Sequence, residues 1–289
     1  MSILVTGATG TVGSLVVQGL AAAGADVHAF VRTPGKQPLP PGVKEVAGDL
    51  TDVASVRDAL AHARTLFLLN AVTPDEVTQA LVALNLAREA GIERIVYLSV
   101  IHADRYTNVP HFTGKHTVER MIETLDIPAT ILRPAYFMQN ERMVQAAIQG
   151  HGVYPMPIGS TGVAMVDARD IADVAVAELL RRDRAAAPLA RTTIELVGPE
   201  ALTGDSVARI WSEALGREVA YGGDDLQAFE RQMASFGPGW LAYDMRLMMG
   251  GIQRLGMRGE EGAVARVEAI LGRPMRGYRA FVAEAVAAA

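Results

Sequence analysis

Short apolar segments alternate with amphipathic segments through the first half of the chain. The apolar segments are rich in Val, Ile and Leu, which is typical of strands covered on both faces of a sheet. They predict strands at Ser2–Val5, Asp26–Val31, Val43–Ala47, Thr65–Leu69, Arg94–Leu98 and Ala129–Leu132. The segments between them have helical periodicity and predict helices at Thr11–Ala23, Val53–Ala61, Asp75–Ala90 and Pro110–Leu125. This alternation predicts an α/β fold with a doubly wound, mostly parallel sheet.

Beyond Pro134 the pattern becomes mostly helical, with Gly and Pro residues between the segments. One strand is expected at Thr192–Val197. Helices are expected at Phe137–Gly150, Arg169–Arg181, Ser206–Leu215, Asp225–Phe236, Trp240–Gly251, Glu260–Leu271 and Tyr278–Ala287. We therefore expect residues 1–134 to form a Rossmann core. Residues 135–289 are expected to form a smaller, mostly helical substrate lobe, some segments of which return to the core.

A glycine-spaced turn, Gly7-Ala8-Thr9-Gly10-Thr11-Val12-Gly13, follows the first predicted strand and opens a helix. In such a turn the first glycine allows a sharp bend and the second lets the backbone approach a pyrophosphate. The third lets the helix pack closely on the strand. The first amides of the helix lack partners within it and attract an anion. The turn predicts a dinucleotide site with amides from Gly10, Thr11 and Val12, and with Gly7 and Thr9 in the same cofactor-binding set.

Composition narrows the classes of function. The chain has 289 residues, 50% of them hydrophobic, which is enough for a large core. The net charge is −5 and no basic run is present, so nucleic acid is not an expected partner. With no cysteine and six unclustered histidines, we expect no disulfide and no metal site. The sequence has neither a secretion signal nor a long apolar span, so a cytoplasmic protein without membrane contact is expected. No feature indicates an oligomer.

The Gly-x-x-Gly-x-x-Gly spacing resembles that of the short-chain dehydrogenase/reductase superfamily, especially its extended and atypical branches. Further motifs resemble the NmrA-like group of atypical reductases in order and spacing: Gly48-Asp49-Leu50, Leu98-Ser99, His111-Phe112-Thr113-Gly114-Lys115, Leu132-Arg133-Pro134 and Val166-Asp167-Ala168-Arg169-Asp170-Ile171-Ala172. The resemblance covers almost the whole chain. It implies an NAD(P)-binding Rossmann fold whose C-terminal lobe shapes a substrate pocket over the nicotinamide. Asp167 is expected to cap a helix rather than to act chemically.

The end of the second predicted strand bears on the choice of cofactor. Sites for NAD usually place Asp or Glu there, to accept hydrogen bonds from the ribose hydroxyls. This chain has Arg32 followed by Thr33. A guanidinium can hold a 2′-phosphate through two hydrogen bonds, and Thr33 can add a hydroxyl donor. We therefore expect NADP(H), with NAD as the second choice. The alternative is that Arg32 stacks on adenine or points to solvent.

Two further strand ends are expected to contact the cofactor. The resemblance implies that Asp49 and Leu50 bracket the adenine, and that Asn70 and Ala71 face a ribose. The alternatives are that Asp49 caps the next helix and that Asn70 is a turn residue.

The reaction centre departs from the usual pattern. Ordinary short-chain reductases carry a Tyr and a Lys four residues apart on one helix, with a Ser from the preceding strand end. By resemblance this chain keeps Ser99 and Lys115 but has His111 in place of the Tyr. Residues four apart share a helix face, so His111 and Lys115 are expected to point together into the crevice. Lys115 is expected to bind the nicotinamide ribose, and His111 to act as a general acid, because imidazole titrates near neutral pH. Alternatively, His111 only begins the helix.

The substrate is expected to contact two segments. By resemblance, the chain after the sixth predicted strand passes beside the nicotinamide, so Tyr136, Phe137 and Asn140 are expected at the substrate, with Tyr136 as a second candidate acid. Trp240 and Tyr243 belong to a soft apolar segment that suits a planar hydrophobic molecule. Core packing is an equal alternative for these aromatic residues.

Together these residues favour an NADP(H)-dependent oxidoreductase that transfers hydride to a hydrophobic carbonyl or quinone-like small molecule. The proton would come from His111, Tyr136 or water. The retained Ser99 and Lys115 favour an enzyme. The missing Tyr favours the alternative, a non-catalytic NAD(P)-binding redox sensor that acts through a protein partner, as some NmrA-like proteins do.

Overall fold

A seven-stranded parallel sheet forms the centre of the computed structural model, which describes residues 2–288. Its strands lie in the order β3-β2-β1-β4-β5-β6-β8. The chain order reverses between β1 and β4, and sheets of this kind bind ligands beside that reversal, at the carboxyl ends of the strands. The strands are β1 Ser2–Val5, β2 Val27–Val31, β3 Lys44–Ala47, β4 Ala63–Leu68, β5 Ile95–Leu98, β6 Ala129–Pro134 and β8 Thr192–Leu196.

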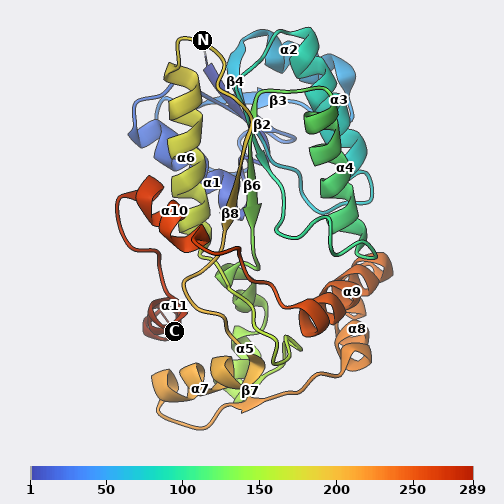
Figure 1. Ribbon diagram of the computed structural model, residues 1–289, viewed down its shortest axis with the longest axis vertical. Coiled ribbons are helices and arrows are strands. Elements are labelled where there is room, and N and C mark those ends of the chain that lie inside the picture. Colours follow the sequence, from blue (N-terminus) through green and yellow to red (C-terminus); the bar gives the residue numbers. More distant parts are fainter. Residues whose placement is uncertain (1, 289) are drawn as a thin grey trace.

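Helices cover both faces of this sheet (Figure 1). On one face α1 packs along α6, and α10 packs against α6 and β8; on the other face α2, α3 and α4 lie side by side. These helices are α1 Thr11–Ala22, α2 Val53–Ala61, α3 Glu76–Glu89, α4 Pro110–Thr124, α6 Ala168–Arg184 and α10 Ala263–Leu271. The expected doubly wound α/β fold is therefore confirmed.

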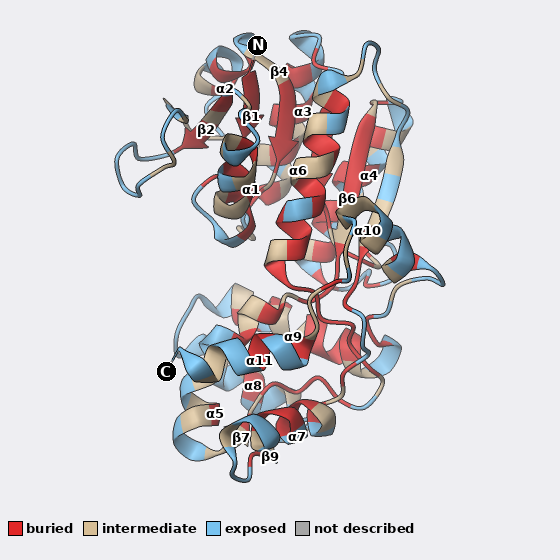
Figure 2. Ribbon diagram, turned by 90° about the vertical axis from the view of Figure 1, so that its left-hand side faces the viewer, coloured by how far each residue is buried: buried red, intermediate tan, exposed pale blue. Residues whose placement is uncertain are grey.

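The sheet has one hydrophobic core on each of its faces. The strands contribute to both cores, because successive side chains on a strand point to opposite faces. Ile3 and Val5 are buried in the core beneath α1, whereas Leu4 is buried in the core beneath α2 and α3. Figure 2 shows the strands buried between helices whose outer faces are exposed. Burial on both faces explains why the strands are continuously apolar in the sequence.

A second layer of short elements lies below the carboxyl ends of the strands (Figure 2). It contains a small parallel sheet of β7 and β9. None of the helices within residues 2–288 has the length and apolar character needed to cross a bilayer. The elements of this layer are the 3-10 helix η1 Met138–Met143, α5 Gln145–His151, β7 Val153–Tyr154, α7 Gly204–Leu215, β9 Ala220–Tyr221, α8 Leu226–Ala234, α9 Gly239–Leu255 and α11 Tyr278–Ala287.

The prediction of one helix over Phe137–Gly150 is wrong, because the segment divides into η1 and α5. In a 3-10 helix, residues three apart lie above one another, and here this places Met138 and Glu141 together in the interior. Strands β7 and β9 were not predicted. Each has two residues, too few to establish an alternating pattern.

Glu141 is an ionisable group in the core of this second layer. It is 1% exposed, and its two carboxyl oxygens accept hydrogen bonds from the hydroxyls of Tyr154 and Tyr278, both at 3.1 Å. Tyr278 in turn accepts a hydrogen bond from Trp211 Nε1 at 3.0 Å. Burial raises the pKa of Glu141 to about 7, and the two tyrosine hydrogen bonds oppose this shift.

We expect Glu141 to make stability fall as pH rises between about 4.5 and 7. The folded state holds the Glu141 proton in this range whereas the unfolded chain releases it, so the free energy of unfolding decreases with pH. A shift of this size corresponds to about 3 kcal/mol, at about 1.4 kcal/mol per pKa unit. Urea unfolding at several pH values should show this slope in the native chain and a smaller one in Glu141→Gln. The exposed Glu89→Gln is the control. An unchanged slope in Glu141→Gln would contradict the assignment.

Candidate active site

A cavity of about 430 Å³ lies where β1, β4, β5 and β6 end and the second layer begins. Its sheet side is formed by the segments that follow these strands and by the first turns of α4. Helices α8 and α9 supply the opposite wall. The structure brings many of the predicted site residues together here: Gly10, Thr11, Val12, Asn70, Ala71, Ser99, His111, Lys115, Tyr136, Phe137 and Asn140.

The glycine turn has the geometry that its spacing predicts. Gly7 has a φ of +61°, and a Cβ built there would lie 2.2 Å from Leu69 Cδ2. A Cβ at Gly13 would lie 2.0 Å from the carbonyl oxygen of Gly7, so α1 approaches the turn too closely for any side chain. Gly10 is exposed, and a Cβ there would meet Gly7 O at 3.3 Å. The protein itself therefore requires glycine at positions 7 and 13 much more strongly than at position 10.

One detail of the predicted anion site is wrong. The Gly10 amide donates a hydrogen bond to the carbonyl of Gly7 at 2.9 Å, so it is used within the turn. The amides of Thr11 and Val12 begin α1 and have no acceptor within residues 2–288. These two amides remain available to an anion at the positive end of the helix. Thr9 is exposed beside them.

The residues expected at the adenosine end lie outside the cavity, along the same edge of the sheet. Arg32 and Thr33 are exposed directly after β2. Asp49 follows β3, and its carboxylate accepts hydrogen bonds from the Thr51 amide at 2.8 Å and hydroxyl at 2.6 Å. These bonds lower the pKa of Asp49. The N-cap of α2 is Asp52, so the alternative in which Asp49 caps that helix is wrong. Leu50 lies partly buried against the core beneath α2.

Three buried polar atoms of residues that line the cavity have no hydrogen-bond partner within residues 2–288. They are Asn70 Oδ1, after β4, Ser99 Oγ, after β5, and the Tyr136 hydroxyl, after β6. Buried polar groups almost always have a partner, so unpaired ones at a cavity indicate a ligand or water that completes them. The amide nitrogen of Asn70 has only a long contact, 3.4 Å, to Gln79 Oε1.

Lys115 is buried on α4 and faces Glu76 at the start of α3. Lys115 Nζ lies 4.0 Å from Glu76 Oε1. Burial lowers the pKa of Lys115 and raises the pKa of Glu76, while each partner's charge opposes the other's shift. A Cβ at Gly114 would lie 2.9 Å from Val77 and 3.2 Å from the Glu76 carboxylate, so glycine lets the two helices approach. The glycine of the His111–Lys115 motif thus allows this ion pair.

His111 lines the cavity one turn before Lys115, as the spacing predicts. Its Nδ1 lies 2.7 Å from Oδ2 of Asp244, which is 1% exposed on α9. The sequence analysis missed both Glu76 and Asp244. Asp244 does carry a signal, because a single carboxylate lies four residues before the buried Met248 and so shares its helix face. Glu76 has no comparable signal, since acidic residues are common in the first turn of any helix.

Of the residues expected to contact the substrate, some line the cavity and others do not. Tyr136, Phe137 and Asn140 line the cavity. The hydroxyl of Tyr136 is buried without a partner within residues 2–288, and burial raises its pKa well above the ordinary value. Trp240 and Tyr243 do not line it and are 40% and 48% exposed.

The position of Tyr243 follows from helical geometry. At about 100° per residue, Tyr243 lies on the face of α9 opposite to Met245 and Met249, which line the cavity. Its ring instead packs against the guanidinium of Arg246, 4.6 Å from the ring centroid. The expectation that Trp240 and Tyr243 line the substrate site is therefore wrong, and Met245, Met248 and Met249 of the same helix line the cavity instead.

Methionine dominates the apolar wall of the cavity. Thioether side chains are flexible and polarisable, and they adapt to flat aromatic molecules. The lining methionines are Met143, Met156, Met233, Met245, Met248, Met249 and Met257. Three phenylalanines, Phe112, Phe137 and Phe229, also line the cavity.

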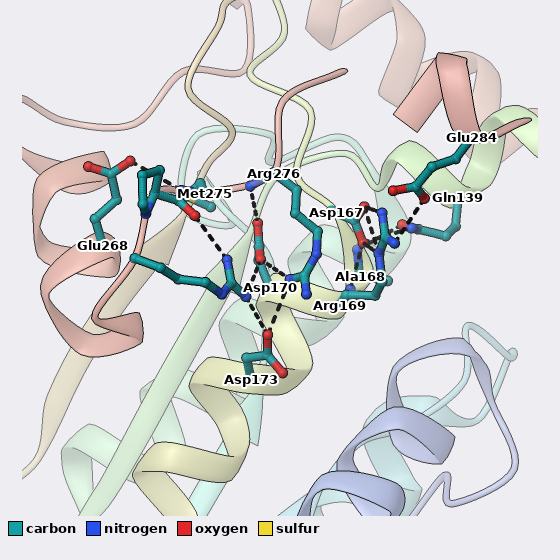
Figure 3. Close-up of polar contacts among 12 residues, drawn as sticks. Gln139, Asp167, Ala168, Arg169, Asp170, Asp173, Glu268, Met275, Arg276 and Glu284 are labelled. Atoms are coloured by element: carbon teal, nitrogen blue, oxygen red, sulfur yellow. Dashed lines mark hydrogen bonds and ion pairs between the residues drawn. The ribbon is translucent and has the colours of Figure 1, made fainter. Parts of the chain in front are cut away.

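The acidic residues at the start of α6 have structural roles (Figure 3). Asp167 caps the helix by accepting the Arg169 amide at 2.8 Å, and it also accepts a hydrogen bond from Gln139 at 2.9 Å. The fully buried Asp170 accepts hydrogen bonds from the Arg273 side chain at 2.9 Å and the Arg276 amide at 2.8 Å. These contacts hold the segment before α11 against α6. In residues 2–288 no cluster of three or more metal-ligating side chains is present.

Comparison with known proteins finds reductases among those that this chain resembles. The chain is 33% identical over 241 residues to the NAD(P)H azoreductase of Xenophilus azovorans, covering 81% of each chain. It is 31% identical over 286 residues to the (4-alkanoyl-5-oxo-2,5-dihydrofuran-3-yl)methyl phosphate reductase of Streptomyces griseus, covering 98% of this chain and 97% of that protein.

The chain also resembles a reductase of known structure. The NADPH-dependent quinone oxidoreductase of Escherichia coli superimposes with a TM-score of 0.84 and 25% identity, over 98% of this chain and 99% of that one. The NmrA-like family model matches residues 1–248. The similarity inferred from short motifs is thus confirmed, and the chain belongs to the NmrA-like family.

Proposed function

We propose that this protein is an NADPH-dependent oxidoreductase that reduces a hydrophobic, quinone-like or carbonyl-containing small molecule in the cavity. One observation carries the proposal. A single methionine-rich cavity contains both the start of α1, with its available amides, and the Ser99, His111 and Lys115 side chains. An anionic cofactor and an apolar acceptor therefore have complementary surfaces in the same space.

The residues present fit a dinucleotide. The amides of Thr11 and Val12, with the space above Gly10, would hold the pyrophosphate. Asn70, Ala71 and Lys115 would hold the ribose near the reaction centre, and a ribose hydroxyl would complete the unpaired Asn70 oxygen. Asp49 and Leu50 would bracket the adenine. When bound, the nicotinamide supplies the hydride of the reduction.

The chain itself supplies the proton and the apolar surroundings. His111 lies in the cavity wall and can donate to an oxygen of the acceptor, with Tyr136 as the second candidate. Lys115 adds a positive charge to the lining of the cavity, which favours negative charge developing on the substrate oxygen. The methionine wall excludes water around a flat aromatic acceptor. The names of the relatives, azoreductase and quinone oxidoreductase, support acceptors of this class.

The decisive test measures NADPH oxidation by the purified protein with a panel of quinones, azo dyes and aromatic ketones, followed by nicotinamide absorbance. We expect acceptor-dependent oxidation with at least one of these classes. Tight NADPH binding without oxidation by any acceptor would overturn the proposal and favour the sensor.

Fluorescence titration with NADPH and with NADH, which compares the two affinities, tests the role of Arg32. A bidentate, charge-assisted contact to the 2′-phosphate contributes about 1.5–3 kcal/mol, so NADPH should bind about 10- to 100-fold more tightly than NADH. Arg32→Asp should abolish this preference. Equal affinities in the native protein would contradict the choice of NADPH.

A further inference from the structure

We propose that Asp244 is a positioning residue for His111, and that the two form an acid–base pair assembled from the two layers of the molecule. The inference rests on the proposed reductase function for its chemistry, but its geometry stands independently. His111 is on α4, beside the sheet, and Asp244 is on α9, in the wall over the cavity. Figure 1 shows the lower end of α4 beside α9.

The contact between the two side chains is short and buried. His111 Nδ1 and Asp244 Oδ2 lie 2.7 Å apart, with side-chain exposures of 9% and 1%. The ring also packs edge-on against Phe112, with centroids 4.8 Å apart. A carboxylate at this distance fixes a proton on Nδ1 and holds the ring in one orientation. No partner of Nε2 is found within residues 2–288, so this nitrogen is free to act in the cavity.

Each of the two carboxylates near the ring has its own nitrogen partner. The charged groups that face the ring are Glu76 on α3, Lys115 on α4 and Asp244 itself. Lys115 Nζ lies 4.0 Å from Glu76 Oε1, whereas His111 Nδ1 lies 2.7 Å from Asp244 Oδ2. Within residues 2–288 the other carboxyl oxygen, Asp244 Oδ1, is buried without a hydrogen-bond partner, so the His111 ring is the polar contact of this carboxylate.

The proton transfer needs only His111, the acceptor and solvent. The N–H bond at Nε2 of the protonated ring breaks, and an O–H bond forms at the acceptor oxygen. The electron pair of the broken bond stays on the ring, which becomes neutral with its proton on Nδ1, held by Asp244. A solvent proton then restores Nε2–H. Asp244 keeps its negative charge throughout, as the orienting carboxylate does in other histidine-based sites.

The pair is tested with two substitutions of matched shape. Asp244→Leu removes both the charge and the hydrogen-bond acceptors with the same number of side-chain heavy atoms, whereas Asp244→Asn removes the charge and keeps one acceptor oxygen. In Asp244→Leu we expect kcat at neutral pH to fall by about 10²-fold. KM for the quinone and the affinity for NADPH should change little. Glu230→Gln, which removes a carboxylate that pairs with Arg246 of α9 at 2.5 Å, is the control.

A readout without cofactor or substrate separates this inference from the proposed function. In the native protein, NMR of the histidine ring should show a downfield, exchange-protected Nδ1–H of His111, and its ring titration should move to lower pH in Asp244→Leu. An unchanged titration would overturn the pairing whatever the activity. A native protein that shows the protected proton but reduces no acceptor would refute the reductase and leave the pair intact. If Asp244→Leu does not fold, the pairing is tested by the Nδ1–H signal of the native protein and by the His111 ring titration in Asp244→Asn.

Discussion

Replacing His111 by Ala is expected to lower kcat by about 10²- to 10⁴-fold, the usual contribution of a positioned general acid. The affinity for NADPH should hardly change, because the expected phosphate contacts come from the start of α1, on another element. Lys115→Ala, in contrast, should weaken both turnover and NADPH binding, since Lys115 is expected to bind the ribose as well. Steady-state kinetics with a reactive quinone and fluorescence titration of NADPH measure the two effects separately.

The matched control is His116→Ala, on the same helix but outside the cavity lining. Its kinetics should stay close to those of the native protein. If His111→Ala turns over normally, the proton comes from Tyr136 or water. Tyr136→Phe then distinguishes the two, because it removes the buried hydroxyl that has no partner.

Replacing Gly10 by Val is expected to abolish dinucleotide binding while the fold is kept. Gly10 is exposed and has extended backbone angles, φ −83° and ψ 177°, which a β-branched residue adopts readily. The one close protein contact of a Cβ there is Gly7 O, at 3.3 Å, which a small shift relieves. The rest of the side chain would occupy the space in front of the Thr11 and Val12 amides, where the pyrophosphate is expected. Fluorescence titration with NADPH and thermal unfolding measure binding and stability.

Gly239→Val provides the comparison. Gly239 is the first residue of α9, and a Cβ there would have no neighbour within 4 Å among residues 2–288, so this variant reports the general effect of Val at a helix start. It should bind NADPH normally. A folded Gly10→Val that binds NADPH as tightly as the native protein would show that the phosphates lie elsewhere.

The sequence by itself determined the order of strands and helices in the sheet region and the glycine turn that opens α1. These features are local. The apolar run of Ile3, Leu4 and Val5 reports burial on both faces of one strand, and the glycines at 7 and 13 report backbone constraints within one turn. The four-residue spacing of His111 and Lys115 also follows from one helix, which is why the structure places both in one cavity.

Tertiary structure alone decided which side chains face His111 and Lys115. Asp244 is 133 residues from His111 in sequence, and Glu76 reaches Lys115 only because Gly114 lets α3 and α4 approach. The rotation of α9 turned its methionines, rather than Tyr243, toward the cavity, and the 3-10 turn of η1 moved Glu141 into the core. Each outcome depends on how separately formed elements pack. Periodicity identifies the buried face of an element, but the partner on that face is set by long-range packing that no local pattern records.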